Sequence, residues 1–432
     1  MLTPIIQHSA ELIAFINAMN IELYQPQIRH LLHMVDAILT SSAAKTISGL
    51  YRLLKEQPSP KNGADFLRES PWKPEDISGP RKRWMLIKFL ELASQINKGF
   101  KIIISIDDSL GKKGKATKHL EAVDHHHNHL ESSRRKQAYT NGYVYVEVHV
   151  QIGPFGFLFD TRLYLREKTV RRLNRQRPAE KHLPFRTKYA LARQMLVELE
   201  QLLPKGHKVY VVFDSWYASK RLIEFCRRQN WHVICALKSN RRIDKVRVDQ
   251  HNLTLKHRPY QRVTLKAVDK QHQARSYYTR LIQGHLEEIA APVHVIISKK
   301  RPGDKRPKYF ACTDLALSVW QVLSIYQKRW AVEVDNIYLK RALGLGDFRL
   351  QSMEATQKWF AVVMLAINYL QYRLALTYSK SLVMVPLADL IRQHRLEHFQ
   401  NLLRFVLRRF AAPQQIEDCL QEVFATSSWA II

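Results

Sequence analysis

Cysteine is scarce in this chain of 432 residues, which has only four thiols, at Cys226, Cys235, Cys312 and Cys419. No two of them have the Cys-x2-Cys spacing that zinc-binding and redox motifs use. The low content suits a reducing compartment. The sequence therefore predicts no cysteine-based metal site.

A secretory signal and a membrane-spanning run are also missing. The N-terminus, MLTPIIQHSAELIAF, lacks the basic start and continuous apolar core of a signal peptide. The longest notable uncharged apolar stretch, 359–372, has 14 residues, fewer than the roughly 20 that a helix needs to cross a bilayer. We therefore expect a cytoplasmic protein with no membrane partner, in which this stretch forms a buried core helix.

Acidic residues are too few to balance the basic ones. The chain has 68 Lys and Arg against 38 Asp and Glu, a formal net charge of +30. The excess is distributed over many short basic segments, so no single segment is typical of a nuclear signal or a disordered tail. A charge of this size attracts a polyanion. The pattern predicts an extended nucleic-acid-binding surface on a folded protein.

The first part of the chain, residues 1–98, has the apolar spacing of helices, interrupted by segments that carry Pro and Gly. A small basic helical region ahead of a catalytic core suggests binding to specific DNA ends. The alternative is a structural cap on the core.

From residue 101 the apolar period changes. The segment 101–107, KIIISID, is a continuous apolar run followed by acids, which predicts a buried strand. The segments YVYVEVHVQIG and FGFLFDTRLYL predict a hairpin. A helix over about 187–203, a strand KVYVVFD, a helix over about 217–229 and a strand WHVICALK follow. Three meandering strands followed by alternating helices and strands predict an α/β fold with a ribonuclease-H-like core, whose first part covers 99–239.

The sequence after residue 239 is divided into three predicted regions. Residues 240–320 contain four β-like pieces in basic sequence, 321–350 a helix, and 351–432 further helices. We detect no internal repeat and no low-complexity segment.

The segment YQKRWAVEVDNIYLK, within 321–350, is the most informative part of the chain. At 100° per residue, Tyr326, Arg329 and Lys340 all lie within about 40° of Glu333 on one helical face. An ion-paired, solvated surface helix is the simpler interpretation of Arg329 and Glu333 at i, i+4. However, two further carboxylates occur where a phosphodiester-cleaving enzyme would need them.

This Tyr-x2-Arg-x3-Glu-x6-Lys pattern resembles the Tyr-Arg-Glu-Lys signature of bacterial DDE transposases of the insertion-sequence-four superfamily, which includes the Tn-five group. The resemblance covers about 100–350. It implies a β-rich insertion at 240–320, a homodimer in the complex with DNA, nucleoid association in a prokaryote and excision through hairpin ends.

Cleavage of DNA by two metal ions needs converging carboxylates, because Mg²⁺ prefers oxygen ligands. We expect two Mg²⁺ ions, with Mn²⁺ as a substitute, held by Asp108, Asp214 and Glu333. Asp107 ends the strand KIIISID and Asp108 follows it directly, and alternation allows only one of them to reach the metals. The resembling pattern has the ligand directly before a hydroxyl residue, which matches Asp108 followed by Ser109.

Asp214 ends the strand VYVVFD, where an unpaired buried charge would be costly. Its alternative role is to cap the following helix.

The other members of the signature are assigned to DNA. Arg329 and Lys340 are expected to pair with phosphates of the transferred end, and Tyr326 to hydrogen-bond a phosphate oxygen. Trp330 occupies a place where the resembling enzymes stack an aromatic ring on nucleobases. Its alternative is a core position.

The tract DHHHNH at 124–129 looks like a metal tract, but its spacing fits neither a helix nor a finger. A flexible basic loop that faces DNA is the interpretation we prefer.

Together these observations predict a DNA transposase that binds the terminal inverted repeats of an insertion sequence, cleaves the ends and joins their 3′-hydroxyls to target DNA. The alternatives are a catalytically inactive DNA-binding descendant and a ribonuclease-H-like, structure-specific nuclease.

Overall fold

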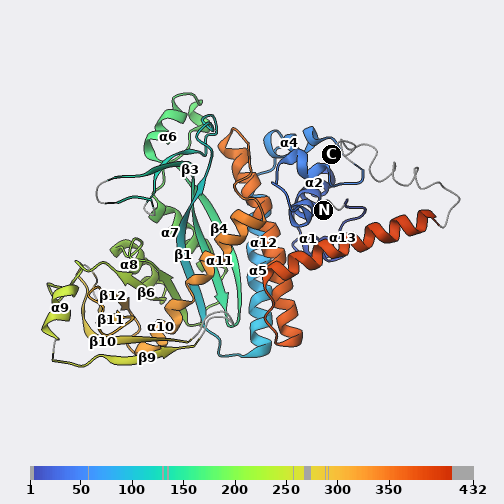
Figure 1. The fold of residues 1–432 in the computed structure, drawn as a ribbon. Coiled ribbons are helices and arrows are strands. Elements are labelled where there is room, and N and C mark those ends of the chain that lie inside the picture. Colours follow the sequence, from blue (N-terminus) through green and yellow to red (C-terminus); the bar gives the residue numbers. More distant parts are fainter. Residues whose placement is uncertain are drawn as a thin grey trace.

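The computed structural model describes residues 4–56, 58–128, 131–133, 136–255, 257–266, 274–287, 289 and 291–410. Figure 1 shows helices at both ends of the described chain, packed beside a large twisted sheet. The mixed α/β class predicted from the sequence is confirmed. Cys419 and His129 lie outside the described residues.

The N-terminal part is helical, as expected. Its helices are α1 (Ala10–Asn17), α2 (Gln25–Thr40), α3 (Ile47–Tyr51), α4 (Pro60–Arg68) and α5 (Pro74–Ile96). Proline occupies the first or second position of α2, α4 and α5, where its missing N–H has no intrahelical partner to lose. These helices bury apolar faces in the same core as the sheet.

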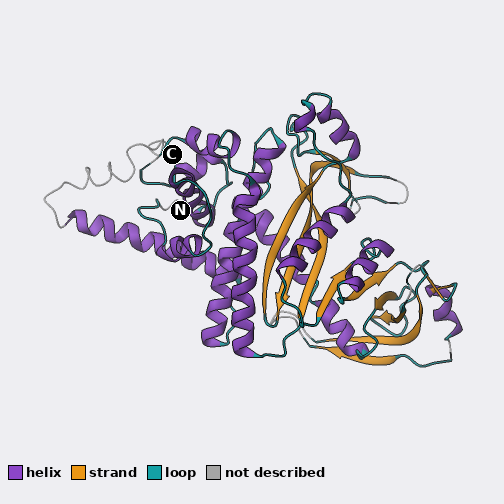
Figure 2. Cartoon of the chain, turned by 180° about the vertical axis from the view of Figure 1, so that it is seen from behind, coloured by secondary structure: helices purple, strands orange, loops and turns teal. Residues whose placement is uncertain are grey.

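One ten-stranded sheet forms the centre of the molecule (Figure 2). Its strands are β1 (Ile102–Lys112), β2 (Asp124–His127), β3 (Tyr139–Ile152), β4 (Phe155–Tyr164), β5 (Val209–Phe213), β6 (His232–Leu237), β9 (Gln261–Leu265), β10 (Arg275–His285), β11 (Pro292–Lys299) and β12 (Lys308–Cys312). The order is β2-β3-β1-β5-β6-β12-β11-β10-β9, and β4 pairs with β3 outside this path. The predicted hairpin is the antiparallel pair β3 and β4.

Register brings the predicted acidic strand ends together. In the parallel pair β1 and β5, Ile106 lies opposite Phe213, so Asp107 and Asp214 follow at equivalent positions. In the antiparallel pair β1 and β3, Asp107 lies opposite Glu147. Side chains at equivalent positions of paired strands point to the same face. The sheet therefore gathers three carboxyl groups on one side.

The strands predicted within 240–320 continue this sheet. β12 pairs antiparallel with β6, and β11, β10 and β9 follow by antiparallel pairing. A two-stranded ribbon, β7 (Arg242–Ile243) and β8 (Val246–Arg247), and helix α9 (Val248–Thr254) lie beside them. The inserted segment is thus joined to the core by strand hydrogen bonds.

Helices cover both faces of the sheet. Ile103, Tyr210 and Val212 pack against α10 (Val319–Gln327). The opposite face carries α7 (Lys188–Leu202) and α8 (Lys220–Arg228) in the larger core. A short helix α6 (Glu167–Asn174) and a 3₁₀ turn η1 (Ala179–Lys181) connect β4 to α7.

The single helix expected within 321–350 is interrupted. α10 ends at Gln327, α11 covers Trp330–Ile337, and a π-helical segment η2 covers Tyr338–Ala342. Between α10 and α11 the backbone N–H groups of Lys328 and Arg329 bond to the carbonyls three residues earlier. The tight turn and the wide π segment break the uniform 100° step. The directions of the signature side chains are therefore set by their contacts.

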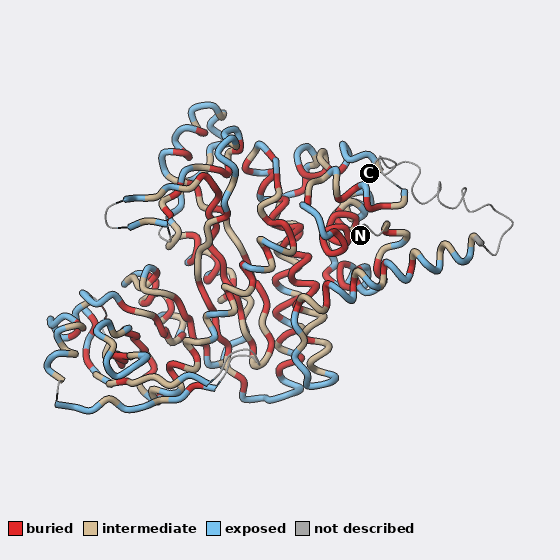
Figure 3. Tube along the Cα trace, viewed as in Figure 1, coloured by how far each residue is buried: buried red, intermediate tan, exposed pale blue. Residues whose placement is uncertain are grey.

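The C-terminal region consists of α12 (Met353–Ser381) and α13 (Leu387–Phe410). α12 is long and apolar enough to cross a membrane, but 72% of its most apolar window is buried inside the protein. Figure 3 shows this helix largely red, in contact with α5 and β4. The predicted buried core helix is confirmed, although it is longer than the stretch 359–372.

Candidate active site

Asp107 lies where β1 approaches the break between α10 and α11. Its Oδ2 accepts a hydrogen bond from the Arg329 guanidinium. Burial raises the pKa of Asp107 to about 6; the Arg329 charge lowers it, while the negative charges of Asp214 and Glu333 raise it further. Asp107 is thus electrostatically coupled to both other candidate carboxylates.

Asp108 points to the other face of the sheet. Its Oδ2 accepts a hydrogen bond from Lys188 Nζ on α7 at 2.6 Å, and its Oδ1 one from the Tyr217 hydroxyl at 3.2 Å. The structure therefore separates the two adjacent acids, as alternation requires. It places Asp107, and not the motif-matched Asp108, on the side of α11.

Asp214 follows the last residue of β5. Its Oδ1 accepts backbone N–H bonds from Trp216 at 2.9 Å and Tyr217 at 3.2 Å. The cap of the next helix, α8, is instead Ser219, whose side chain accepts from Leu222 N. The alternative role of Asp214 as the cap of this helix is therefore wrong, and the carboxylate organises the turn that leaves the strand.

Glu333 lies in the first turn of α11, and its side chain is 39% exposed. Arg329 Nη2 is 3.7 Å from Glu333 Oε1, while Nη1 of the same guanidinium binds Asp107. One cation therefore lies between two of the candidate metal ligands. The negative charges of Asp107 and Glu333 therefore favour a positive charge between them.

Two other signature residues contact the protein itself. Lys340 Nζ donates to Ser109 Oγ at 2.5 Å and to the Leu110 carbonyl at 3.0 Å. The Tyr326 ring packs against Phe310, and burial raises the pKa of its hydroxyl to about 12. Both side chains thus connect α10 and η2 to strands β1 and β12.

Trp330, the residue next to Arg329, is 50% exposed. This exposure overturns the alternative of a core tryptophan. A half-exposed indole at the start of α11 is available to stack on a planar ligand.

A buried polar network below Glu333 fixes α11 on the sheet. Asp335 Oδ2 pairs with His149 Nδ1 at 2.5 Å, and its Oδ1 accepts from Gln371 Nε2 at 2.9 Å. Asn336 donates to Glu147 and accepts from the Tyr145 hydroxyl. The sequence analysis missed these residues, although Glu147 and His149 interrupt an otherwise apolar strand at alternate positions.

Glu147 is fully buried, and its Oε2 has no hydrogen-bond partner. Burial raises the pKa of this carboxyl well above its usual range, and the charges of Asp107 and Asp335 act in the same direction. A protonated Glu147 contributes a donor or acceptor to the network without adding a third negative charge beside Asp107 and Asp335.

The described part of the histidine tract differs from the expected flexible loop. Residues 124–127 form the edge strand β2, paired with β3. Asp124 accepts from the Thr169 hydroxyl, and burial lowers the pKa of His126 to about 4. Strand pairing with β3, which periodicity within this short tract could not reveal, orders it.

Within the described residues, the carboxylates of Asp107, Asp214 and Glu333 do not form a group whose ligand atoms all lie within 4.8 Å of one another. Their oxygens are nevertheless the donor type that Mg²⁺ prefers. A divalent ion between Asp107 and Glu333 would have to displace the Arg329 guanidinium. The donor atoms therefore have the chemistry that a divalent ion needs.

Comparison with known proteins gives one family. Residues 187–369 match the family model described as a transposase DDE domain, and no curated protein matches the chain. The matched range contains Asp214 and Glu333 but begins after Asp107 and Asp108. The match supports a DDE transposase, an enzyme whose substrate is DNA.

Proposed function

We propose that this protein is a DNA transposase that binds the terminal inverted repeats of an insertion sequence, cleaves both ends and joins the 3′-hydroxyls to target DNA. The observation that carries the proposal is the placement of Asp214 and Glu333, both inside the matched transposase domain. Asp214 follows its strand at the position equivalent to Asp107, and Arg329 contacts both Asp107 and Glu333. We also propose that the protein belongs to the insertion-sequence-four superfamily, on the basis of its Tyr-Arg-Glu-Lys signature.

The proposed core is ribonuclease-H-like. The strand order β4-β3-β1-β5-β6 supports this assignment, since β3 is antiparallel to both neighbours and β5 is parallel to β1 and β6. In such a sheet the acidic ends of adjacent parallel strands meet at one edge.

Asp107 or Asp108, Asp214 and Glu333 are the proposed ligands of two Mg²⁺ ions. Bound there, the ions would stabilise the attacking and leaving oxygens of phosphodiester cleavage. The hydroxyl motif favours Asp108, whereas the shared strand face and the coupling to Asp214 and Glu333 favour Asp107. We infer that Asp107 is the ligand and that Asp108 positions Lys188.

Arg329 has two proposed states. Without metal it neutralises Asp107 and Glu333. With metal, the released guanidinium is free to bind a phosphate of the DNA end, in the geometry that suits bidentate contacts. Lys340 and Tyr326, which contact the protein itself in this structure, are proposed to bind the same DNA strand.

Recognition of the repeats is assigned to the N-terminal helices, which expose Arg29, Arg52 and Lys61. Because α2 and α5 pack against α12, this recognition should be tested in the whole chain. A homodimer on paired DNA ends and excision through hairpins complete the proposal.

End-labelled duplexes that carry the inverted repeats flanking the gene, incubated with protein and Mg²⁺, test the proposal on denaturing gels. Nicks at the repeat boundary, followed by joined products, are expected. Binding without cleavage would identify an inactive descendant, and cleavage set by branched structure without regard to the repeats would identify a nuclease.

A further inference from the structure

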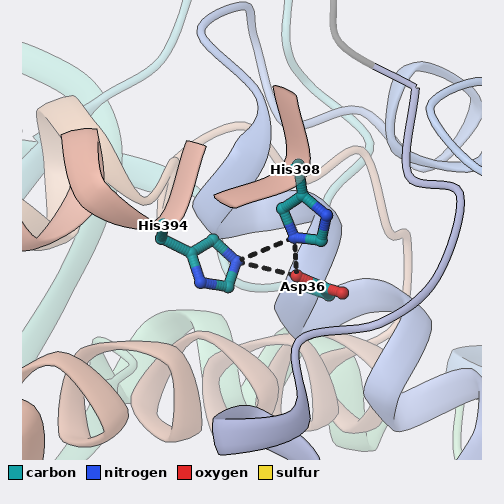
Figure 4. A group of neighbouring side chains, drawn as sticks. All are labelled: Asp36, His394 and His398. Atoms are coloured by element: carbon teal, nitrogen blue, oxygen red, sulfur yellow. Dashed lines mark hydrogen bonds and ion pairs between the residues drawn. The ribbon is translucent and has the colours of Figure 1, made fainter. Parts of the chain in front are cut away.

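A cluster of histidines around one aspartate lies far from the candidate active site, where the N-terminal helices meet α13. Figure 4 shows Asp36 of α2 facing His394 and His398 of α13. All three side chains have zero exposure. In the described part of the chain, this is the one group of three Asp, Glu, His or Cys ligand atoms that lie within 4.8 Å of one another.

The geometry converges on a single point. His394 Nε2 lies 2.7 Å and His398 Nε2 2.8 Å from the same oxygen, Asp36 Oδ1. The two Nε2 atoms are 3.3 Å apart. Three potential ligand atoms, one oxygen and two imidazole nitrogens, therefore form a small triangle inside the protein.

The local sequence explains the convergence. His394 and His398 are four residues apart on one helix, a spacing that turns both rings to the same side. Pairs of histidines at i, i+4 are a common source of zinc ligands on helices. Asp36 comes from a different helix, so the group connects residues 358 and 362 positions apart in sequence.

A purely hydrogen-bonded cluster would place two imidazole N–H groups against one oxygen, with their hydrogens close together. In a tetrahedral zinc site with bonds of about 2.0–2.1 Å, two ligand nitrogens lie about 3.3 Å apart. The observed separation of the Nε2 atoms already has this value.

A third histidine, His8, contacts the Asp36 carboxylate from the other side. His8 Nδ1 is 2.6 Å from Asp36 Oδ2, the oxygen that does not face His394 and His398. A hydrogen bond of this kind fixes the orientation of a ligating carboxylate. The His8 ring is 5.0 Å from that of His33, whose pKa burial lowers to about 4, together with the nearby positive charges. His33 therefore adds no charge at neutral pH.

We propose that Asp36, His394 and His398 form a structural site for a zinc ion, with a water molecule in the fourth position. Only a small outward movement of the Asp36 carboxylate is needed for the ion to enter among the three atoms. The ion would fasten α13 to α2, and through His8 also the segment that precedes α1. The donor set, two imidazoles and one carboxylate, suits Zn²⁺ better than Mg²⁺.

Full-length, tag-free protein is treated with chelator and then titrated with Zn²⁺. The buffer contains excess Mg²⁺, which occupies the carboxylates of the active site. The background is the double variant His125→Gln/His127→Gln, which removes ligands of the surface tract. We expect one tightly bound Zn²⁺ per chain by metal analysis after dialysis. At free Zn²⁺ about 100 times Kd, the folding equilibrium constant should rise about 100-fold.

Ligand variants in that background identify the site. His398→Gln should lose the tight ion, whereas His8→Gln should retain it with an affinity lowered about 10- to 100-fold. The exposed His285→Gln is the control and should bind as tightly as the parent. A folded His398→Gln protein that binds Zn²⁺ as tightly as the parent would overturn the proposal.

A second measurement does not depend on the folding of any variant. Co²⁺ bound in place of Zn²⁺ should give the visible d–d absorption of a four-coordinate site, and X-ray absorption at the zinc edge should show two imidazoles and no sulfur. No tight ion per chain, or an octahedral all-oxygen shell, would leave Asp36 as a hydrogen-bonded acceptor only.

Discussion

Asp108 is bound by Lys188, on the face of the sheet opposite to Glu333. Its neighbour Asp107 points to the α11 side, where Arg329 contacts both Asp107 and Glu333. A single step along β1 thus separates a lysine-paired carboxylate from one coupled to the candidate metal ligands.

Substitutions of the acids should therefore have unequal effects. We expect Asp107→Asn, Asp214→Asn and Glu333→Gln each to lower strand cleavage about 1000-fold or more, because each removes an anionic metal ligand worth several kcal/mol. Asp108→Asn should cost less. Cleavage of end-labelled DNA measures the loss, and filter binding checks that DNA binding remains. If Asp108→Asn were inactive and Asp107→Asn active, the hydroxyl motif would have identified the correct ligand.

DNA binding should weaken steeply with salt. The chain carries a net charge of +30, so the logarithm of affinity should fall linearly with the logarithm of salt concentration as counterions are released. The variant Lys305→Ala/Arg306→Ala removes two exposed cations from the segment between β11 and β12. If both contact phosphates, the slope should decrease by about 2. Fluorescence anisotropy measures the slopes, with Asp214→Asn as a control; a flat salt response would contradict an extended surface.

Trp330→Ala should separate the first nick from later steps. The side chain is 50% exposed, so the free energy of unfolding should change by no more than about 0.5 kcal/mol. Loss of base stacking worth about 1–3 kcal/mol should slow hairpin formation or opening roughly 5- to 150-fold while nicking continues. Denaturing gels would show nicked DNA accumulating.

Trp320→Ala is the matched control, since Trp320 on α10 is 46% exposed and is assigned no contact with DNA. Equal slowing of nicking and of the later steps by Trp330→Ala would argue against a stacking role.

Asp160 should contribute to the free energy of unfolding, and this contribution should depend on pH. It is buried on β4, and its Oδ2 binds Lys82 Nζ of α5 at 2.6 Å. Burial tends to raise the pKa of Asp160, but the charges of Lys82, Arg162 and Arg81 outweigh it and hold the pKa below the usual value. Asp160→Asn should cost about 3–5 kcal/mol near pH 7, because it leaves buried cations unpaired.

A depressed pKa stabilises the folded state at pH values above the ordinary carboxyl pKa, and this stabilisation is lost as the pH falls through the folded-state pKa. The difference between wild type and Asp160→Asn should therefore shrink in acid. Urea unfolding followed by tryptophan fluorescence measures it. Asp65→Asn, which removes an exposed partner of Arg68, should change stability by less than about 1 kcal/mol at either pH.

The sequence predicted the elements of the fold better than the contacts between them. Apolar runs and alternation identified β1, β3, β4, β5 and β6, because each strand is buried or half-buried along its own length. They did not show that the strands of 240–320 extend the central sheet, because the pairing of β12 with β6 depends on residues about 75 positions apart, as Cys312 and Ile234 illustrate.

For the candidate site too, local patterns in the sequence predicted individual residues but not the contacts between distant segments. Strand-end position and helical spacing predicted Asp214 and Glu333 as metal ligands, and this stays a prediction. The choice between Asp107 and Asp108 needed the direction of β1 relative to α7 and α11. The uniform helix expected around Arg329 was wrong, because α10 ends at Gln327 and a π-helical segment follows α11. The network of Glu147 and Asp335 depends on packing between distant elements.

The pairing of α2 with α13 has a consequence for protein synthesis. Asp36 leaves the ribosome early, but its partner His394 follows 358 residues later, which takes roughly 20–70 s at about 5–20 residues per second. During this interval Asp36 lacks both histidines of α13 and has His8 as its hydrogen-bond partner. A translation product that stopped before α13 would leave uncovered the face of α2 that packs against α13, so chaperones and proteases would be able to distinguish it from a chain that has closed the contact.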